Sequence, residues 1–165
     1  QTWPPLEAAL YVLSGGAFHP RQHGRDGEPA APAGSEEEPL VSVVCPTCER
    51  RQHFHPQLYA CFEAQEYRRK ELVVVDTGSR PSPFLQELAR EDPRVIYRFF
   101  DVDDLREGIT VRAGKRSWSL GLKRNIACCL ARGEAIAHFD DDDVYAPHYL
   151  STMVPRLLRA SRTSG

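Results

Sequence analysis

Long apolar segments are absent from this 165-residue chain, in which the run from Ala8 to Leu13 already ends at Ser14. A helix that crosses a bilayer needs about 20 apolar residues, so we expect no membrane span in this segment. An excess of one charge sign is absent as well, because 21 basic residues face 23 acidic ones. No global field therefore attracts nucleic acid, and any nucleotide must be recognised locally.

Cysteine is also scarce, and its pattern argues against a disulfide framework. The chain has five cysteines, an odd number without a repeated spacing, which favours a reducing compartment such as the cytoplasm. Cys45 and Cys48 have the spacing of zinc ligands, with His53 and His55 nearby. Cys45, however, lies in a predicted buried strand, so we interpret it as a small core residue. We place Cys61, Cys128 and Cys129 in the core too.

Composition divides the chain into two parts. We interpret residues 1–39 as an N-terminal extension and flexible linker, since 4–13 could form a short helix and 15–39 consist mainly of Gly, Pro, Ala and charged residues. Residues 40–165 are rich enough in apolar side chains for one domain. The chain begins at Gln1 and ends in a polar segment without a clear packing element. We therefore expect a domain truncated at its C-terminus.

From Leu40 onward, β-branched runs alternate with helical patterns, which is typical of βαβ units. This predicts an α/β fold with a mainly parallel sheet flanked by helices. The expected strands are 41–45, 71–75, 94–99 and 134–139; the expected helices are 57–65, 83–90, 120–131 and one opened by Pro147. Residues 101–117 are interpreted as a polar surface loop, with a mobile flap carrying Lys115 and Arg116 as the alternative.

The acidic run Asp140–Asp143 follows a predicted apolar strand. Four successive carboxylates repel one another, so a compensating charge is expected, and a hard divalent cation such as Mg²⁺ or Mn²⁺ suits carboxylate ligands. Alternation would place Asp140 and Asp142 on one face. The carboxyl ends of parallel strands share one edge of the sheet, so Thr47, Asp76 and the acidic run should converge there. An exposed acidic turn without function is the alternative.

Taken together and in this order, five segments resemble the nucleotide-binding half of glycosyltransferase family two. They are Val41–Thr47, Val74–Ser79, Lys123–Asn125, Ala131–Ala137 and Phe139–Asp143. The resemblance covers about residues 40–158 and implies a GT-A fold, which is Rossmann-like, and a nucleotide-diphosphate-sugar donor. It also implies a DXD motif after the last of these strands.

The resemblance implies roles for individual residues in this chain. Asp76 would accept a hydrogen bond from the nucleobase, and Thr47 and Glu49 would lie in the loop that touches the base. Arg124 would lie near the base and diphosphate, while Lys123 beside it is expected on an exposed helix face. Asp140 would approach the ribose and Asp142 the metal, with Asp141 competing for either role.

Three differences from the family pattern stand out. Cys48 and Glu49 replace a common Tyr-Asn pair, which removes an aromatic ring that could cover the base, and Thr77 replaces a frequent second aspartate. The general base of the family comes from the second half of the domain. The catalytic residue is therefore unknown here and expected beyond Gly165.

The first hypothesis is a metal-dependent, inverting glycosyltransferase that moves a sugar from a nucleotide-diphosphate donor, with a UDP-sugar expected first, to an unknown acceptor hydroxyl. A divalent cation would stabilise negative charge on the departing diphosphate. The alternative is a nucleotide-sugar-binding module without turnover. A nucleotidyltransferase is a third reading, but the first loop lacks the glycine-rich, basic composition that it would favour.

Overall fold

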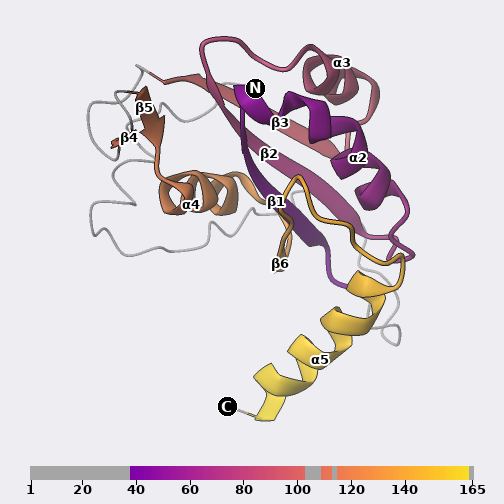
Figure 1. Ribbon diagram of the computed structural model, residues 1–165. Coiled ribbons are helices and arrows are strands. Elements are labelled where there is room, and N and C mark those ends of the chain that lie inside the picture. Colours follow the sequence, from indigo (N-terminus) through magenta and orange to yellow (C-terminus); the bar gives the residue numbers. More distant parts are fainter. Residues whose placement is uncertain (1–37, 103–108, 113–114, 164–165) are drawn as a thin grey trace, which may run out of the picture. The chain divides into compact units, whose positions relative to one another are not determined.

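Four parallel strands form the sheet at the centre of the fold, in the order β3-β2-β1-β6 (Figure 1). The computed structural model describes residues 38–102, 109–112 and 115–163, with the backbone alone at 109–112, 115–117, 162 and 163. The predicted helix at 4–13 and almost all of the predicted linker lie outside these residues. The strands are β1 (Val41–Cys48), β2 (Lys70–Gly78), β3 (Val95–Asp101) and β6 (Ala135–His138). The predicted parallel α/β sheet is confirmed.

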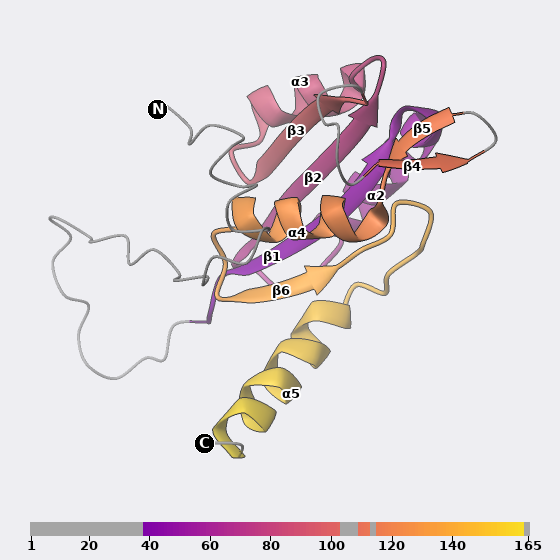
Figure 2. The same cartoon turned by 90° about the vertical axis from the view of Figure 1, so that its left-hand side faces the viewer.

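Helices cover both faces of this sheet. Helices α2 (His55–Glu63) and α3 (Pro83–Glu91) lie on one face, and α4 (Leu120–Leu130) lies on the other (Figures 1 and 2). Ser82 and Ser119 cap α3 and α4, because each hydroxyl accepts a hydrogen bond from the amide three residues later. Helix α5 (Tyr149–Thr163) follows the acidic run. In the part of the chain that is described, no helix combines the length and apolar character needed to cross a membrane.

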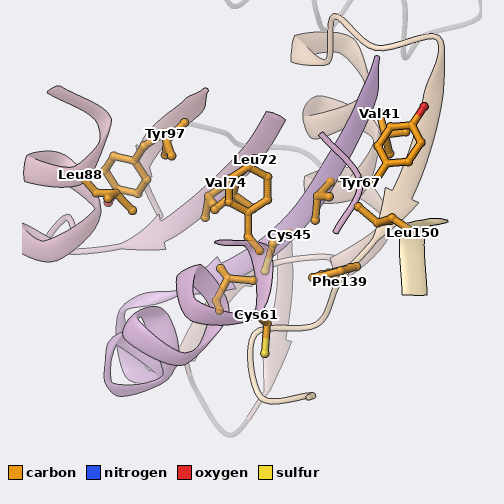
Figure 3. Close-up of a cluster of buried hydrophobic side chains, with 14 of the residues drawn as sticks. Val41, Cys45, Cys61, Tyr67, Leu72, Val74, Leu88, Tyr97, Phe139 and Leu150 are labelled. Carbon is orange, nitrogen blue, oxygen red and sulfur yellow. The ribbon is translucent and has the colours of Figure 1, made fainter. Parts of the chain in front are cut away.

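A contiguous apolar core fills the space between the sheet and the α2/α3 layer. Alternate strand residues point to this face, so Val43 and Cys45 of β1 meet Leu72 and Val74 of β2. The helices contribute Leu58, Cys61, Phe62, Leu85 and Leu88, and Phe139 and Leu150 close the core near the acidic run (Figure 3). Cys45 and Cys61 are therefore core residues, as expected.

Strand β1 continues three residues beyond its predicted end, through Pro46. The carbonyl of Val44 accepts the amide of Phe139 from the β6 side, and Pro46, two residues later, points the same way. The pairing of β1 with β6 stops at Val44, so the N–H that proline lacks would have no strand to bond. Proline is tolerated there for that reason. The longer strand carries Thr47 into the sheet.

The polar stretch 101–117, predicted as a loop, contains an antiparallel hairpin. Strands β4 (Ile109–Arg112) and β5 (Lys115–Trp118) pair with Arg112 opposite Lys115. The prediction gave weight to polarity and overlooked Ile109, Thr110 and Val111, whose β-branched side chains favour a strand. Asp103 and Asp104 lie outside the described residues.

Other predicted boundaries shift by a few residues, and a further element was missed. A 3-10 helix, η1 (Glu49–Phe54), follows β1, and α2 begins at His55 because Pro56 fits the first turn of a helix. The last helix begins at Tyr149, two residues after Pro147. Two residues expected in the core are less buried than predicted, since Cys128 is half-buried and Cys129 is exposed. The buried face of α4 carries Lys123, Ile126 and Ala127 instead.

Gly133, between α4 and β6, packs directly against the start of β1. A Cβ atom at Gly133 would lie 2.6 Å from the Leu40 carbonyl oxygen and 2.7 Å from the Ser42 backbone nitrogen. A Gly133→Ala variant should therefore lose about 1–3 kcal/mol of unfolding free energy. Gly121→Ala is the matched control, because nothing lies within 4 Å of its new methyl group and alanine favours a helix by roughly 0.5–1 kcal/mol. Urea unfolding checks both; equal effects would contradict the packing argument.

Candidate functional site

The ends of β1 and β6 meet through a direct hydrogen bond. The Thr47 hydroxyl donates to Asp141 Oδ2 at 2.6 Å, across 94 residues of sequence. Thr47 is also paired with Asp76 in the register of β1 and β2. The predicted convergence of these segments at the carboxyl edge of the sheet is confirmed.

The acidic run divides into exposed and buried members. The side chains of Asp140 and Asp142 are 49% and 45% exposed, whereas that of Asp141 is 3% exposed. Asp140 accepts a hydrogen bond from Arg124 at 3.1 Å. Asp140 and Asp142 therefore offer carboxylates to a ligand, while Asp141 points into the protein.

Arg51 lies between two of these carboxylates. Its Nε donates to Asp141 Oδ1 at 2.7 Å, and one terminal nitrogen contacts Asp141 Oδ1 at 2.5 Å and Asp142 Oδ1 at 2.6 Å. The hydrogen bond from Arg51 lowers the pKa of Asp142. Arg51 was not among the predicted site residues, because it lies in the unpredicted η1 and no local spacing links it to the acidic run.

A buried chain of hydrogen bonds runs beneath the site. Because an ionised carboxylate only accepts, Thr47 uses its proton on Asp141 and must accept from His55 Nε2 at 2.9 Å. His55 Nδ1 then accepts from the Ser82 hydroxyl at 2.8 Å. The Ser82 amide donates to Tyr97, whose hydroxyl donates to Asp76 Oδ2 at 2.7 Å. The chain therefore connects Asp76 with the acidic run and holds His55 in one tautomer.

His55 should make stability depend on pH. It is fully buried, and burial lowers its pKa from 6.5 to about 4. A folded-state pKa below the unfolded one means that the contribution is complete above pH 6.5 and is lost as pH falls toward 4. Between pH 7 and 4.5 this loss is about 2–3 kcal/mol. Chemical unfolding at both pH values measures it.

The control for this pH effect is His55→Gln, whose amide can donate to Thr47 and accept from Ser82 without titrating. Carboxyl groups also titrate in this range, so the difference between the two proteins is the quantity to compare. A pH dependence in His55→Gln as steep as in the wild type would contradict the assignment.

Asp76 and Arg124 each carry an atom without a partner. Among the residues that the structure describes, Asp76 Oδ1 and Arg124 Nε are the buried side-chain nitrogen and oxygen atoms that make no hydrogen bond. Burial raises the pKa of the Asp76 carboxyl, and the Tyr97 hydrogen bond opposes that rise. Buried polar atoms without a hydrogen-bond partner are rare, and a ligand that binds there is one explanation for them.

The Glu49 side chain makes hydrogen bonds within the protein. Its carboxylate accepts from the Ser79 amide at 2.9 Å and from Arg80 Nε at 3.1 Å, and these contacts lower its pKa, the Ser79 amide most. A Cβ atom at Gly78 would lie only 2.5 Å from the Glu49 Cβ, so Glu49 packs directly against this glycine. Glu49 thus ties η1 to the end of β2.

The position of Lys123 differs from the expected one. It was placed on an exposed helix face, but it is buried and its Nζ donates to the Thr47 carbonyl at 2.8 Å. Burial lowers the pKa of Lys123, and nearby groups that include Asp76 and Asp141 oppose this. Its spacing from Ile126 and Ala127 on α4 was the overlooked signal.

The carboxylates at this edge suit a hard cation that completes its coordination with water and phosphate oxygens. Within the described segments, no cluster of three or more His, Cys, Asp or Glu side chains forms a metal cage. Mg²⁺ and Mn²⁺ commonly use one or two carboxylates and complete their shell with water and phosphate oxygens. The exposed carboxylates of Asp140 and Asp142 fit that requirement.

Comparisons with known proteins identify the family of this sequence. The family model "Glycosyl transferase family 2" matches residues 42–163. The chain is 30% identical over 118 residues to "Putative colanic acid biosynthesis glycosyl transferase WcaA" of Escherichia coli K12, covering 70% of this chain and 37% of that protein. It is 28% identical over 120 residues to an uncharacterised protein, y4gI, of Sinorhizobium fredii, covering 72% of this chain and 12% of the relative. The chain thus spans about a third or less of these curated relatives.

Solved structures share the fold. The crystal structure of S. aureus TarS, residues 1–349, aligns with a TM-score of 0.52 and 20% identity, covering 73% of this chain and 32% of TarS. At this identity the likeness establishes the architecture, which is the GT-A arrangement of a parallel sheet between helices. Since the family model covers most of the chain, the protein belongs to glycosyl transferase family 2.

Proposed function

We propose that the carboxyl edge of the sheet binds a nucleoside-diphosphate sugar and supports transfer of the sugar to an acceptor hydroxyl. The observation that carries this proposal is the pair of unmet buried atoms, Asp76 Oδ1 and Arg124 Nε. Both belong to residues that the family resemblance assigns to the nucleotide. A ligand with an N–H donor at one end and phosphate oxygens at the other would satisfy both.

Asp142 is the proposed metal contact and Asp140 the proposed ribose contact. Their side chains are exposed, whereas Asp141 is buried and accepts hydrogen bonds from Thr47 and Arg51. Asp141 therefore acts in this proposal by holding Thr47 in place. A bound Mn²⁺ or Mg²⁺ would supply positive charge where a departing diphosphate develops negative charge.

Arg124 and Lys123 provide fixed positive charge beside the same site. Arg124 reaches Asp140 at 3.1 Å, and its planar guanidinium can also bind phosphate oxygens. Lys123 holds the Thr47 carbonyl from below. In this proposal, Arg124 binds the donor and Lys123 fixes the end of β1 beside it. Inversion at the sugar would follow from a single displacement, with the acceptor base supplied outside the described residues.

The choice of nucleotide is tested by a binding panel. UDP is tested first because a TarS structure contains UDP-GlcNAc, and GDP, ADP and CDP follow, each with and without Mn²⁺. Calorimetry should show one preferred base and tighter binding with Mn²⁺. In Arg124→Gln, the affinity should fall about 10-fold or more, as expected for a lost charged hydrogen bond.

Arg156→Gln is the matched control for this variant, because Arg156 is an exposed arginine of α5 and should leave affinity unchanged. Absence of binding for every nucleoside diphosphate would refute the proposal. Binding without sugar transfer or hydrolysis in the full-length protein would favour the second candidate, a nucleotide-sugar-binding module.

A further inference from the structure

Arg51 already supplies a positive charge at the proposed metal ligand. Its guanidinium nitrogen lies 2.6 Å from Asp142 Oδ1. A cation that coordinates Asp142 therefore meets a carboxylate whose charge is partly compensated. The two contacts compete, because a guanidinium and a metal ion repel each other and seek the same oxygen atoms.

The two carboxylates hold Arg51 unequally. Asp141 is buried, takes both Nε and a terminal nitrogen of Arg51, and is itself fixed by Thr47. The Phe54 ring adds a cation–π contact, with the Arg51 guanidinium carbon 5.1 Å from its centroid. The Asp142 side chain is 45% exposed and contacts only one terminal nitrogen of Arg51. Contacts of exposed pairs are worth little, so Arg51 can release Asp142 and stay on Asp141.

Positive side chains offset part of the negative charge of the site before a donor binds. The carboxylates of Asp140–Asp143 and Asp76 are faced by three cations, Arg51, Lys123 and Arg124. These cations weaken the attraction of the site for a divalent cation. A nucleoside diphosphate adds negative charge and phosphate ligands, which changes the balance in favour of the cation.

We infer that Arg51 is an internal counter-ion that competes with the divalent cation for Asp142 and makes cation binding depend on the nucleoside diphosphate. The inference rests on the proposed function, because it takes Asp142 as the metal contact. It gives Arg51 a positioning role: the guanidinium stays anchored on Asp141 and yields Asp142 when donor and cation arrive together. A purely structural salt bridge would affect stability without affecting cation affinity.

Manganese titration of the nucleotide-free protein tests this inference, with electron paramagnetic resonance reporting free Mn²⁺. Removing a unit positive charge beside a divalent ion should tighten Mn²⁺ binding about 10-fold in Arg51→Gln. Arg50→Gln is the matched control, because Arg50 is adjacent and exposed, and its Mn²⁺ affinity should stay within about twofold of wild type. The gain in Mn²⁺ affinity produced by UDP should be smaller in Arg51→Gln than in wild type, and unchanged in Arg50→Gln.

Arg51→Lys keeps the folded site testable if the glutamine variant is unstable. Lysine retains the charge but presents a single nitrogen, so it cannot hold both carboxylates in the same way, and Mn²⁺ affinity should rise by less than in Arg51→Gln. Thermal unfolding of each variant accompanies the titration. Unchanged or weaker Mn²⁺ binding in folded Arg51 variants, with Mn²⁺-dependent UDP binding intact in wild type, overturns this inference alone. Failure of the wild type to bind any nucleoside diphosphate of the panel together with Mn²⁺ refutes the proposed function instead.

Discussion

Asp142→Asn should lower the affinity for the preferred nucleoside diphosphate in the presence of Mn²⁺ by about 100-fold, because a coordinated cation contributes several kcal/mol of charge stabilisation. Asparagine keeps the shape of the side chain and can still accept the hydrogen bond from Arg51. The lost property is therefore the negative charge toward the cation. Without metal, the variant should bind the nucleotide no more weakly than the wild type, because it has lost a negative charge that repels the diphosphate. Calorimetry under both conditions measures this interaction.

The matched control is Asp143→Asn. Asp143 is the exposed neighbour of Asp142, so the variant makes the same change of charge one residue away. Its nucleotide affinity should stay within about threefold of wild type, as expected for an exposed charge. Equal losses in the two variants would mean that general electrostatic attraction, and no specific ligand, explains the acidic run.

Glu71→Ala should destabilise the domain by about 2–4 kcal/mol, because it removes a buried acceptor on which several hydrogen-bond donors depend. The Glu71 side chain is 2% exposed and lies at the edge of the sheet opposite the site. It accepts from the Ser42 hydroxyl at 2.6 Å and from the amide and Nε of Arg132, each at 2.7 Å. Alanine leaves these donors without an acceptor and opens a cavity. Urea unfolding provides the measurement.

Two further variants show whether the loss comes from these bonds. Glu71→Gln keeps an acceptor oxygen, so it should retain part of the stability. Glu87→Ala removes an exposed glutamate of α3 and should change stability by less than about 0.5 kcal/mol. The nucleotide affinity of folded Glu71→Gln should match wild type, because Glu71 is remote from the acidic run. A loss below about 1 kcal/mol in Glu71→Ala would contradict the assignment.

The convergence of Thr47, Asp76 and the acidic run was predictable, because it follows from a general property of parallel sheets. Hydrophobic runs identified the four strands, and strand ends identified the edge. Which carboxylate points inward also followed in part from alternation, which placed Asp140 and Asp142 together. Family motifs then supplied the candidate roles.

The partners of those residues were not predictable in the same way. Arg51 reaches Asp141 from 90 residues away, and His55 reaches Ser82 across two elements. Neither contact can be predicted from the spacing of residues in the sequence, since both depend on where η1 and α2 lie on the sheet. Lys123 differs, because its helical spacing from Ile126 could have indicated burial; the strong preference of lysine for solvent outweighed that signal.

The hairpin of β4 and β5 shows the limit of composition. Charged residues dominate the segment 101–117, and polarity alone favours a loop. A short hairpin gains its stability from backbone pairing and from cross-strand contacts. Alternation over four residues is too brief to separate these possibilities.

The most direct test of the donor site is paramagnetic broadening by Mn²⁺ in nitrogen-15 spectra of the wild-type protein with UDP, or with the preferred base. Bound Mn²⁺ broadens the amide signals nearest to it. We expect loss of signal at 140–143 and 47–51 and preserved signals at 131–134, at the opposite edge of the sheet. Broadening that spares 140–143 in the presence of nucleotide would contradict a metal-assisted nucleotide site at Asp142.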